Sequence, residues 1–243
     1  MENVDDVYGS ALASYYNGDK SGNIIFRESD GASVVPTSDF FRRPDEVKTD
    51  RIALSYCRRN VLNLGAGSGE LSLYLHEKGI DVTSIDTSPV ACAIMKQRGL
   101  ESVLSGGLFE HQSELPRTYT WLAIRGYVGQ LGYIHNFIHF LELARNTLYP
   151  GGRVILSSKN LKKEGYRTKM MTCEFDGKVS EEYPKLDVGM STLRRIAESL
   201  NFSCRFVLCD ENNHYVALLI KNKRDHRSRS FQHFRSLDEY RFE

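Results

Sequence analysis

The residues best suited to chemistry are a glycine-rich segment and an acid downstream of it. Gly65, Gly67 and Gly69 follow an apolar run at 61–64 and precede an amphipathic segment. Glycines allow tight turns and close approach of a ligand to the backbone, and a following helix presents unpaired N–H groups. Asp86 lies 17 residues past Gly69, at the end of the next apolar run. A carboxylate there can accept both hydroxyls of a ribose, so the pattern predicts an adenosine site.

The glycine spacing separates two kinds of adenosine cofactor. A dinucleotide fingerprint that begins at Gly65 would need its third glycine at position 70, which is Glu70. Dinucleotide enzymes also need the N-terminus of the following helix for a pyrophosphate, whereas S-adenosylmethionine carries no phosphate. The spacing therefore disfavours a nicotinamide oxidoreductase and favours S-adenosylmethionine.

The elements that position these residues alternate between strand and helix. Such alternation is typical of a parallel sheet with helices on both faces. The sequence predicts an α/β fold: a doubly wound, mostly parallel, seven-stranded sheet with an antiparallel last strand. The predicted strands are 61–64, 81–86, 100–104, 119–124, 153–157, 202–209 and 215–221, and the predicted helices are 70–78, 89–98, 131–148 and 190–200.

Three regions are expected along the chain. Residues 1–58 form an N-terminal cap or lid with a helical pattern at its start, strands at 24–27 and 33–35, and a helix from Pro44 to about Tyr56. Residues 59–223 form the cofactor-binding domain, with an insertion at about 160–187 that contains a strand at 168–175. Residues 224–243 are rich in Arg, Ser and His, and this composition predicts a mobile tail.

Over about residues 55–221 the chain resembles the class I S-adenosylmethionine-dependent methyltransferases. The resemblance extends beyond the glycine motif to the second-strand segment 85–89 and to the Pro150-Gly151-Gly152 turn into the fifth strand. The final antiparallel strand is a further trait of that family, and nicotinamide Rossmann sheets usually lack it. The resemblance implies S-adenosylmethionine as cofactor and methyl transfer as activity, and it does not identify the methyl acceptor.

The same resemblance assigns the parts of the cofactor to segments of this chain. The glycine segment would pass beside the methionine moiety, Asp86 would hold the ribose, and the segment after the third strand would flank the adenine. Three positions depart from the family, which often has acids where Asn63, Gly107 and Thr120 stand. The implied cofactor-binding residues are Gly65, Ala66, Gly67, Gly69, Asp86, Thr87, Gly106, Gly107 and Leu108.

Candidates for the methyl-transfer site follow the fourth predicted strand. Arg125, Tyr127 and His135 are the predicted catalytic residues, with His135 as the best base because its pKa lies near neutrality. A surface position on a helix is the alternative for His135. Arg42 could pair with the cofactor's carboxylate. The aromatic residues near it could form a lid or pack as an ordinary cap helix: Tyr8, Tyr15, Tyr16, Phe40 and Phe41.

A small molecule methylated on oxygen or nitrogen is the favoured acceptor. The segment after the fourth strand, Arg125-Gly126-Tyr127-Val128, lacks the Asn/Asp-Pro-Pro-aromatic motif of amino-methylating DNA and RNA enzymes. An RNA or protein methyltransferase, with the Arg-rich tail guiding a polyanion, is one alternative. A non-catalytic scaffold that kept the fold is another.

Composition sets limits on partners and compartment. With 32 basic and 31 acidic residues the net charge is +1, which argues against a general nucleic-acid binder but allows a local basic patch. The first residues are acidic, and no apolar run approaches the roughly 20 residues that span a bilayer. Five cysteines without a CxxC pair predict reduced thiols, no metal site and a soluble cytoplasmic protein. The oligomeric state is left open.

Overall fold

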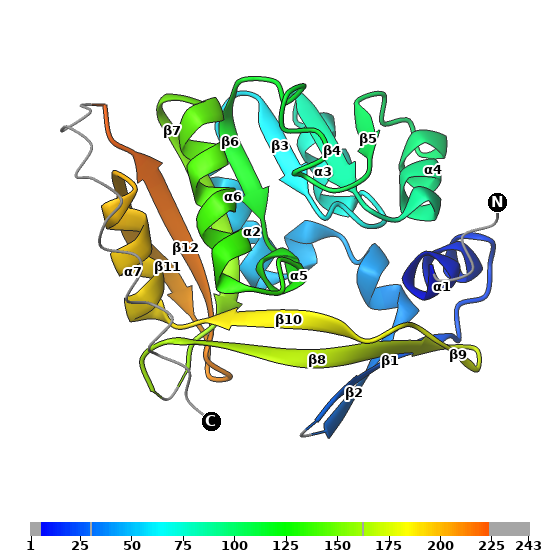
Figure 1. Cartoon of the computed structure of the whole chain (residues 1–243). Coiled ribbons are helices and arrows are strands. Elements are labelled where there is room, and N and C mark those ends of the chain that lie inside the picture. Colours follow the sequence, from blue (N-terminus) through cyan, green and yellow to red (C-terminus); the bar gives the residue numbers. More distant parts are fainter. Residues whose placement is uncertain (1–5, 30, 162, 224–243) are drawn as a thin grey trace.

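The computed structural model describes residues 6–29, 31–161 and 163–223. Their principal feature is a seven-stranded sheet in the order β11-β12-β7-β6-β3-β4-β5 (Figure 1). Five neighbouring strands are parallel, and β12 runs antiparallel to both β7 and β11. The predicted sheet with its antiparallel last strand is therefore confirmed. The strands are β3 Val61–Leu64, β4 Val82–Asp86, β5 Val103–Ser105, β6 Thr118–Ala123, β7 Leu148–Lys159, β11 Phe202–Cys209 and β12 His214–Lys221.

Helices cover both faces of this sheet, because its central strands are apolar on both sides. Ala53 of α2 and Leu75 of α3 pack on one face, against residues such as Leu122. Phe140 of α6 and Ile196 of α7 pack on the other. The helices are α2 Lys48–Ser55, α3 Glu70–Glu77, α4 Pro89–Gln97, α5 Tyr127–Gln130, α6 Ile134–Thr147 and α7 Met190–Ser199. Among the described residues no helix is long and apolar enough to cross a membrane.

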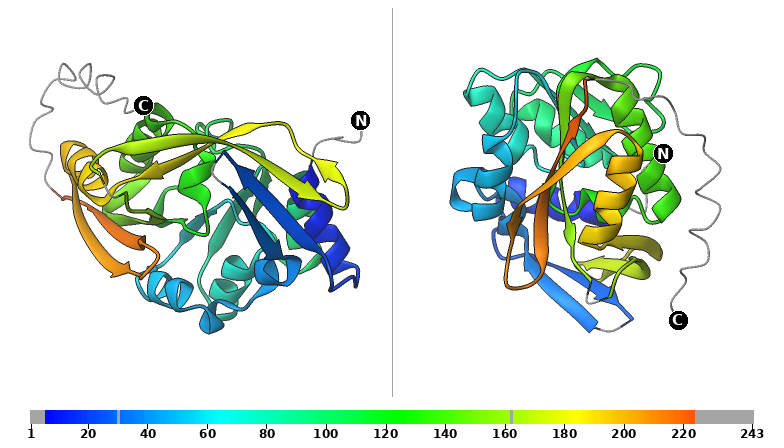
Figure 2. Two further views of the ribbon diagram at one scale, coloured as in Figure 1. Left: turned by 90° about the horizontal axis from the view of Figure 1, so that it is seen from below. Right: turned by 90° about the vertical axis from the view of Figure 1, so that its left-hand side faces the viewer.

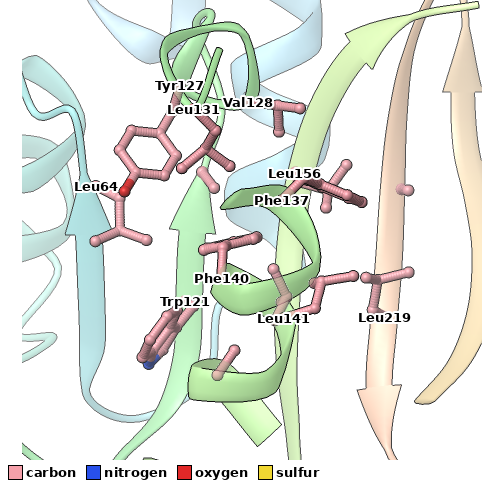
Figure 3. Packing of buried hydrophobic residues seen from close by; sticks show 14 of the residues in the cluster. Leu64, Trp121, Tyr127, Val128, Leu131, Phe137, Phe140, Leu141, Leu156 and Leu219 are labelled. Atoms are coloured by element: carbon pink, nitrogen blue, oxygen red, sulfur yellow. The ribbon is translucent and has the colours of Figure 1, made fainter. Parts of the chain in front are cut away.

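The largest apolar cluster lies between the main sheet and α6. Trp121, Phe137 and Phe140 are fully buried there (Figure 3), and the ring of Phe140 lies 5.8 Å from that of Trp121 and 6.0 Å from that of Phe137. Fully burying a side chain of this size contributes about 1.5–3 kcal/mol, so the cluster fixes α6 against β6. Tyr127 joins this cluster from α5, and its ring lies 6.0 Å from that of Phe140. The core therefore extends up to the segment that follows β6.

A second sheet forms the cap, in the order β10-β8-β1-β2 with β9 paired to β8. It crosses the end of the main sheet at which β3 and β6 finish, and α1 lies beside it (Figures 1 and 2). Two distant parts of the sequence build it: the predicted N-terminal strands and the 160–187 insertion pair through β1 and β8. The cap elements are α1 Val7–Tyr16, β1 Asn23–Glu28, β2 Gly31–Pro36, β8 Tyr166–Phe175, β9 Lys178–Val179 and β10 Tyr183–Val188.

Two predicted helices are shorter than expected. The helix predicted at 131–148 begins only at Ile134, and the separate short helix α5 precedes it. Gly132 separates the two with a left-handed φ of 73°, and a Cβ there would lie 2.7 Å from Pro184 of β10. The helix predicted from Pro44 to Tyr56 divides into a 3₁₀ turn, Pro44–Glu46, and α2. The second 3₁₀ turn, Thr37–Phe41, connects β2 to this region. The predicted tail at 224–243 lies outside the described residues.

Candidate active site

The glycine segment forms a tight left-handed turn between β3 and α3. Gly65, Gly67 and Gly69 have φ values of 63°, 56° and 88°, which residues with a side chain adopt only with strain. Space is limited as well: a Cβ on Gly67 would lie 2.9 Å from the hydroxyl of Tyr8. Both the backbone conformation and the packing of this turn therefore require glycine. The sequence predicts glycine here for the same reason, because another group must approach the backbone closely.

Asp86 ends β4 beside this turn. Its carboxylate accepts hydrogen bonds from the Gly67 N–H at 2.7 Å and from the Ser88 N–H at 2.9 Å. Asp86 is 7% exposed, and this burial raises the pKa of its carboxyl group although the two N–H donors act in the opposite direction. A carboxylate can accept about four hydrogen bonds, so two acceptor positions remain for a ligand.

The cap covers the glycine turn with aromatic side chains. The ring of Tyr8 meets that of Phe40 edge to face at 5.3 Å. The Phe40 carbonyl accepts a hydrogen bond from the Ser68 hydroxyl, which fixes the cap to the turn. Burial raises the pKa of Tyr8, so its hydroxyl stays protonated at neutral pH and can act as a donor. Of the aromatic residues considered for a lid, Tyr8 and Phe40 line the cavity.

Arg125 follows β6 and is paired with a buried acid. Its guanidinium donates to the Asp50 carboxylate at 2.6 and 2.9 Å and to the Arg42 carbonyl at 3.1 Å. Asp50 is 1% exposed, and the φ of Arg125 is 54°, in the left-handed region. This pairing shows that Arg125 positions the loop after β6 as well as lining the cavity. The guanidinium of Arg42 lies 4.0 Å from Asp39 and is half exposed.

One cavity of about 520 Å³ extends from the glycine turn to the cap sheet. Charged side chains of β1, β8 and β10 line its cap side. Glu28 accepts from Lys185 at 2.8 Å and from Lys169 at 3.0 Å. Burial opposes ionisation of Glu28, but the two lysines outweigh it and lower the pKa of the carboxyl group. Arg167 and Asp187 pair at 2.8 Å on the same side.

The structure brings six predicted site residues together at this cavity and leaves seven outside its lining. Gly65, Ala66, Gly67, Asp86, Arg125 and Arg42 line it. Those outside the lining are Gly69, Thr87, Gly106, Gly107, Leu108, Tyr127 and His135.

The placement of the two predicted catalytic residues outside the lining has a physical cause. His135 lies exposed near the start of α6, with its ring stacked on Tyr133, so the alternative surface position is the correct one. Tyr127 is a core residue whose ring closes over Gly65, where a Cβ would lie 2.8 Å from it. Burial raises the pKa of Tyr127, so its hydroxyl stays protonated at neutral pH and is not available as a base.

Side chains of the protein itself pack against the segment that follows β5. Leu108 is buried in the main core, and Thr87, after β4, is exposed. Glu110 lies against Gly106 and Gly107, because a Cβ on either would approach its carboxylate at 2.7 or 3.1 Å. The Glu110 carboxylate thus lies near Gly107, the position at which the resembled family often has an acid.

Asn63 is used inside the fold rather than in the cavity. Its side-chain amide donates to the Ser72 hydroxyl at 2.8 Å, and Ser72 is within 2.8 Å of the Ser84 hydroxyl. All three side chains are buried between β3, β4 and α3. The side-chain amide of Asn63 therefore completes a neutral buried network.

Sequence reasoning missed the charged residues of the cavity wall. Glu28, Asp50, Lys185 and Asp187 line the cavity, yet none belongs to a motif. Glu28, Lys185 and Asp187 come together because β1 and β10 both pair with β8, whereas Asp50 comes from α2 and is paired with Arg125. None of the four lies in a strand that the sequence predicts, since the strands expected there are 24–27, 33–35 and 168–175.

No family model matches this sequence, and no curated protein matches it. Solved structures do share its fold. A methyltransferase from Bacteroides fragilis, crystallised with S-adenosyl-L-homocysteine, is 24% identical with a TM-score of 0.82, over 91% of this chain and 97% of that one. The CcbJ methyltransferase from Streptomyces caelestis is 14% identical with a TM-score of 0.59, over 89% and 98%. The glycopeptide N-methyltransferase MtfA, with the same ligand, is 14% identical with a TM-score of 0.52, over 72% and 88%. The chain therefore has the fold of S-adenosylmethionine-dependent methyltransferases, in agreement with the resemblance in its sequence.

Proposed function

We propose that this protein is an S-adenosylmethionine-dependent methyltransferase that transfers a methyl group to an oxygen or nitrogen of a small molecule. The observation that carries the proposal is the position of Asp86, buried at the end of β4 and hydrogen-bonded to the glycine turn. In a doubly wound sheet, ligands bind at the carboxyl ends of the strands. The methyltransferase fold of the neighbours supports the same function.

The residues present fit this cofactor. Asp86 retains two acceptor positions, which suits the two ribose hydroxyls. The glycine turn leaves its backbone bare beside the cavity, and Arg42 offers a half-exposed guanidinium for a carboxylate. Tyr8 and Phe40 would exclude water above the turn. When bound, the cofactor supplies an activated methyl group on a sulfonium.

The cavity size and wall favour a small, polar acceptor. A single ligand site typically encloses about 300–1,000 Å³, and the 520 Å³ here must hold both cofactor and acceptor. The paired charges around Glu28 and Asp187 would orient polar groups of the acceptor. Orientation and desolvation can supply much of the rate of methyl transfer. A nucleophile without a proton at neutral pH needs no base, so the exposed position of His135 is compatible with the reaction.

Calorimetric titration tests the proposal. S-adenosylmethionine and S-adenosylhomocysteine should bind with micromolar affinity, and NAD, the control, should not bind. Asp86→Ala should weaken the binding by about 1–3 kcal/mol, through loss of charge-assisted hydrogen bonds. Binding of NAD alone would favour an oxidoreductase. If neither sulfur compound binds, the non-catalytic scaffold becomes the better explanation.

We also infer a cytoplasmic location. The five cysteines are all unpaired in the structure, which suits a reducing compartment. Fractionation of cells that produce the protein would test this inference, and recovery with membranes or in the medium would contradict it.

A further inference from the structure

The end of the main sheet opposite the cavity gathers arginine and tyrosine side chains. Arg58 and Arg59 precede β3, Arg117 and Tyr119 lie at the start of β6, and Tyr149 lies at the start of β7. This is the upper edge in Figure 1, away from the cap sheet. We call it the arginine–tyrosine edge, made of Arg58, Arg59, Arg117, Tyr119, Tyr149 and Arg153.

Hydrogen bonds hold the backbone of this edge in place. The Asn60 side chain donates to the Arg117 carbonyl at 2.9 Å and accepts from the Tyr119 N–H at 3.0 Å. The Thr120 hydroxyl accepts from the Arg58 N–H at 2.9 Å and donates to the Arg58 carbonyl at 3.0 Å. The segments before β3 and β6 are therefore fixed side by side, and their side chains project from rigid positions.

The side chains of the edge form a stack of planar groups. Tyr119 and Tyr149 stack with ring centroids 4.7 Å apart. The Arg59 guanidinium lies 4.4 Å from the Tyr119 ring and donates to its hydroxyl at 2.8 Å, and that of Arg117 lies 4.9 Å from the Tyr149 ring. Because both arginines are exposed, planar guanidinium groups face solvent here. Nucleobases stack on such planes as they do on aromatic rings.

The positive charge of this edge is not neutralised within the described part of the chain. No carboxylate forms an ion pair there with Arg58, Arg59, Arg117 or Arg153. Burial and the neighbouring Arg58 lower the pKa of Arg153, and its Nε atom is buried without a hydrogen-bond partner. Mutually repelling guanidinium groups would be stabilised by an added anion such as a phosphate.

We propose that the arginine–tyrosine edge binds single-stranded nucleic acid, with arginines on the phosphates and bases stacked on the exposed guanidinium planes. Stacking planes combined with unneutralised cations characterise single-strand binding sites. An anionic membrane fits less well, because none of the exposed large apolar side chains of the described residues belongs to this edge: Tyr16, Val34, Tyr133, Met170 and Val179. The edge lies at the opposite end of the strands from the cavity, so this proposal does not rest on the proposed function.

Fluorescence anisotropy with a labelled twelve-nucleotide oligouridylate tests the proposal on the full chain. If four phosphates are neutralised, affinity should fall roughly 50-fold between 50 and 200 mM salt. The double variant Arg59→Ala/Arg117→Ala should bind at least about tenfold more weakly at 50 mM salt, with about half the salt dependence. Arg59→Lys/Arg117→Lys keeps the charge but loses the planar groups, and it should bind with intermediate affinity.

Arg195→Ala/Arg205→Ala is the matched control. It removes the same charge from exposed positions on α7 and β11 and should bind like the unaltered protein. If the control weakens binding as much as Arg59→Ala/Arg117→Ala does, the proposal is refuted. Unchanged binding in the Arg59→Ala/Arg117→Ala variant would also refute it, and would mean that the nucleic acid binds to another part of the chain. Absence of binding at 50 mM salt, or equal binding to vesicles of anionic lipid, would also refute the proposal.

Discussion

The Ser88 hydroxyl lies 2.5 Å from a carboxylate oxygen of Asp6, to which it donates a hydrogen bond. Each of these side chains also caps a helix: Ser88 accepts from the Ala91 N–H at the start of α4, and Asp6 accepts from the Gly9 N–H at the start of α1. The Ser88 N–H in turn donates to Asp86. The N-terminal helix of the cap is thus connected to the predicted ribose-binding carboxylate through two capping residues.

Ser88→Ala should destabilise the protein by about 1–2 kcal/mol, because it removes a helix cap and leaves the Asp6 carboxylate without its hydroxyl donor. Urea unfolding followed by circular dichroism measures the change. Ser55→Ala removes an exposed hydroxyl that bonds only within its own helix, and it should change stability by less than about 0.5 kcal/mol. Equal effects of the two substitutions would show that the contact between the caps adds nothing.

Gly9→Ala should also destabilise the fold, although alanine is normally preferred to glycine in a helix. A Cβ at this position would overlap the Asp6 carboxylate and lie 2.6 Å from the Ser88 hydroxyl oxygen. Overpacking costs about 1–3 kcal/mol, which exceeds the roughly 1 kcal/mol of helix propensity gained. The adjacent exposed position gives the control, since Ser10→Ala should be neutral or slightly stabilising. Thermal unfolding measures the stability of both variants. A Gly9→Ala protein that is more stable than the unaltered protein would contradict the packing argument.

Arg125→Ala should be more harmful than Asp50→Ala. Removal of the arginine leaves the buried Asp50 carboxylate without its partner, which costs about 3–5 kcal/mol. Removal of the aspartate leaves an arginine that is 26% exposed and can reach water, so the loss should be smaller. The free energies of unfolding of both single variants and the double variant form a cycle with a coupling of at least about 1 kcal/mol. Additive effects would mean that the pair contributes no net interaction.

The parts of the fold that the sequence predicts are those whose contacts are local in the sequence. The glycine turn, Asp86 at the end of β4 and most of the parallel strands depend on short segments and were predicted within a few residues, whereas β7 begins at Leu148, five residues before its predicted start. Three strands of the cap sheet were predicted separately and β9 and β10 were not predicted, because the pairing of β1 with β8 joins residues such as Arg27 and Thr172 that no local pattern connects. The acids and lysines of the cavity wall were missed for the same reason.

The choice of His135 illustrates a different limit. Histidine's near-neutral pKa makes it a reasonable base, but residue type does not show which face of a helix is buried. The buried face of α6 is formed by Phe137, Phe140, Leu141 and Ala144, and His135 lies on its exposed side.

The raised pKa of Asp86 makes a prediction about cofactor binding and pH. Holding two ribose hydroxyls as acceptor requires the ionised carboxylate, whereas burial favours the protonated form and raises its pKa. The affinity for S-adenosylmethionine should therefore be constant at neutral pH and decrease as the pH falls through the raised pKa, at a higher pH than an ordinary aspartate would give. Calorimetric titration over a pH series measures this decrease, and circular dichroism at each pH verifies that the protein stays folded. Asp86→Asn should bind about 5- to 150-fold more weakly, corresponding to the roughly 1–3 kcal/mol of a lost charge-assisted hydrogen bond, and should not show this pH dependence. A flat profile in the unaltered protein, or the same decrease in the Asn variant, would show that another group than Asp86 governs binding.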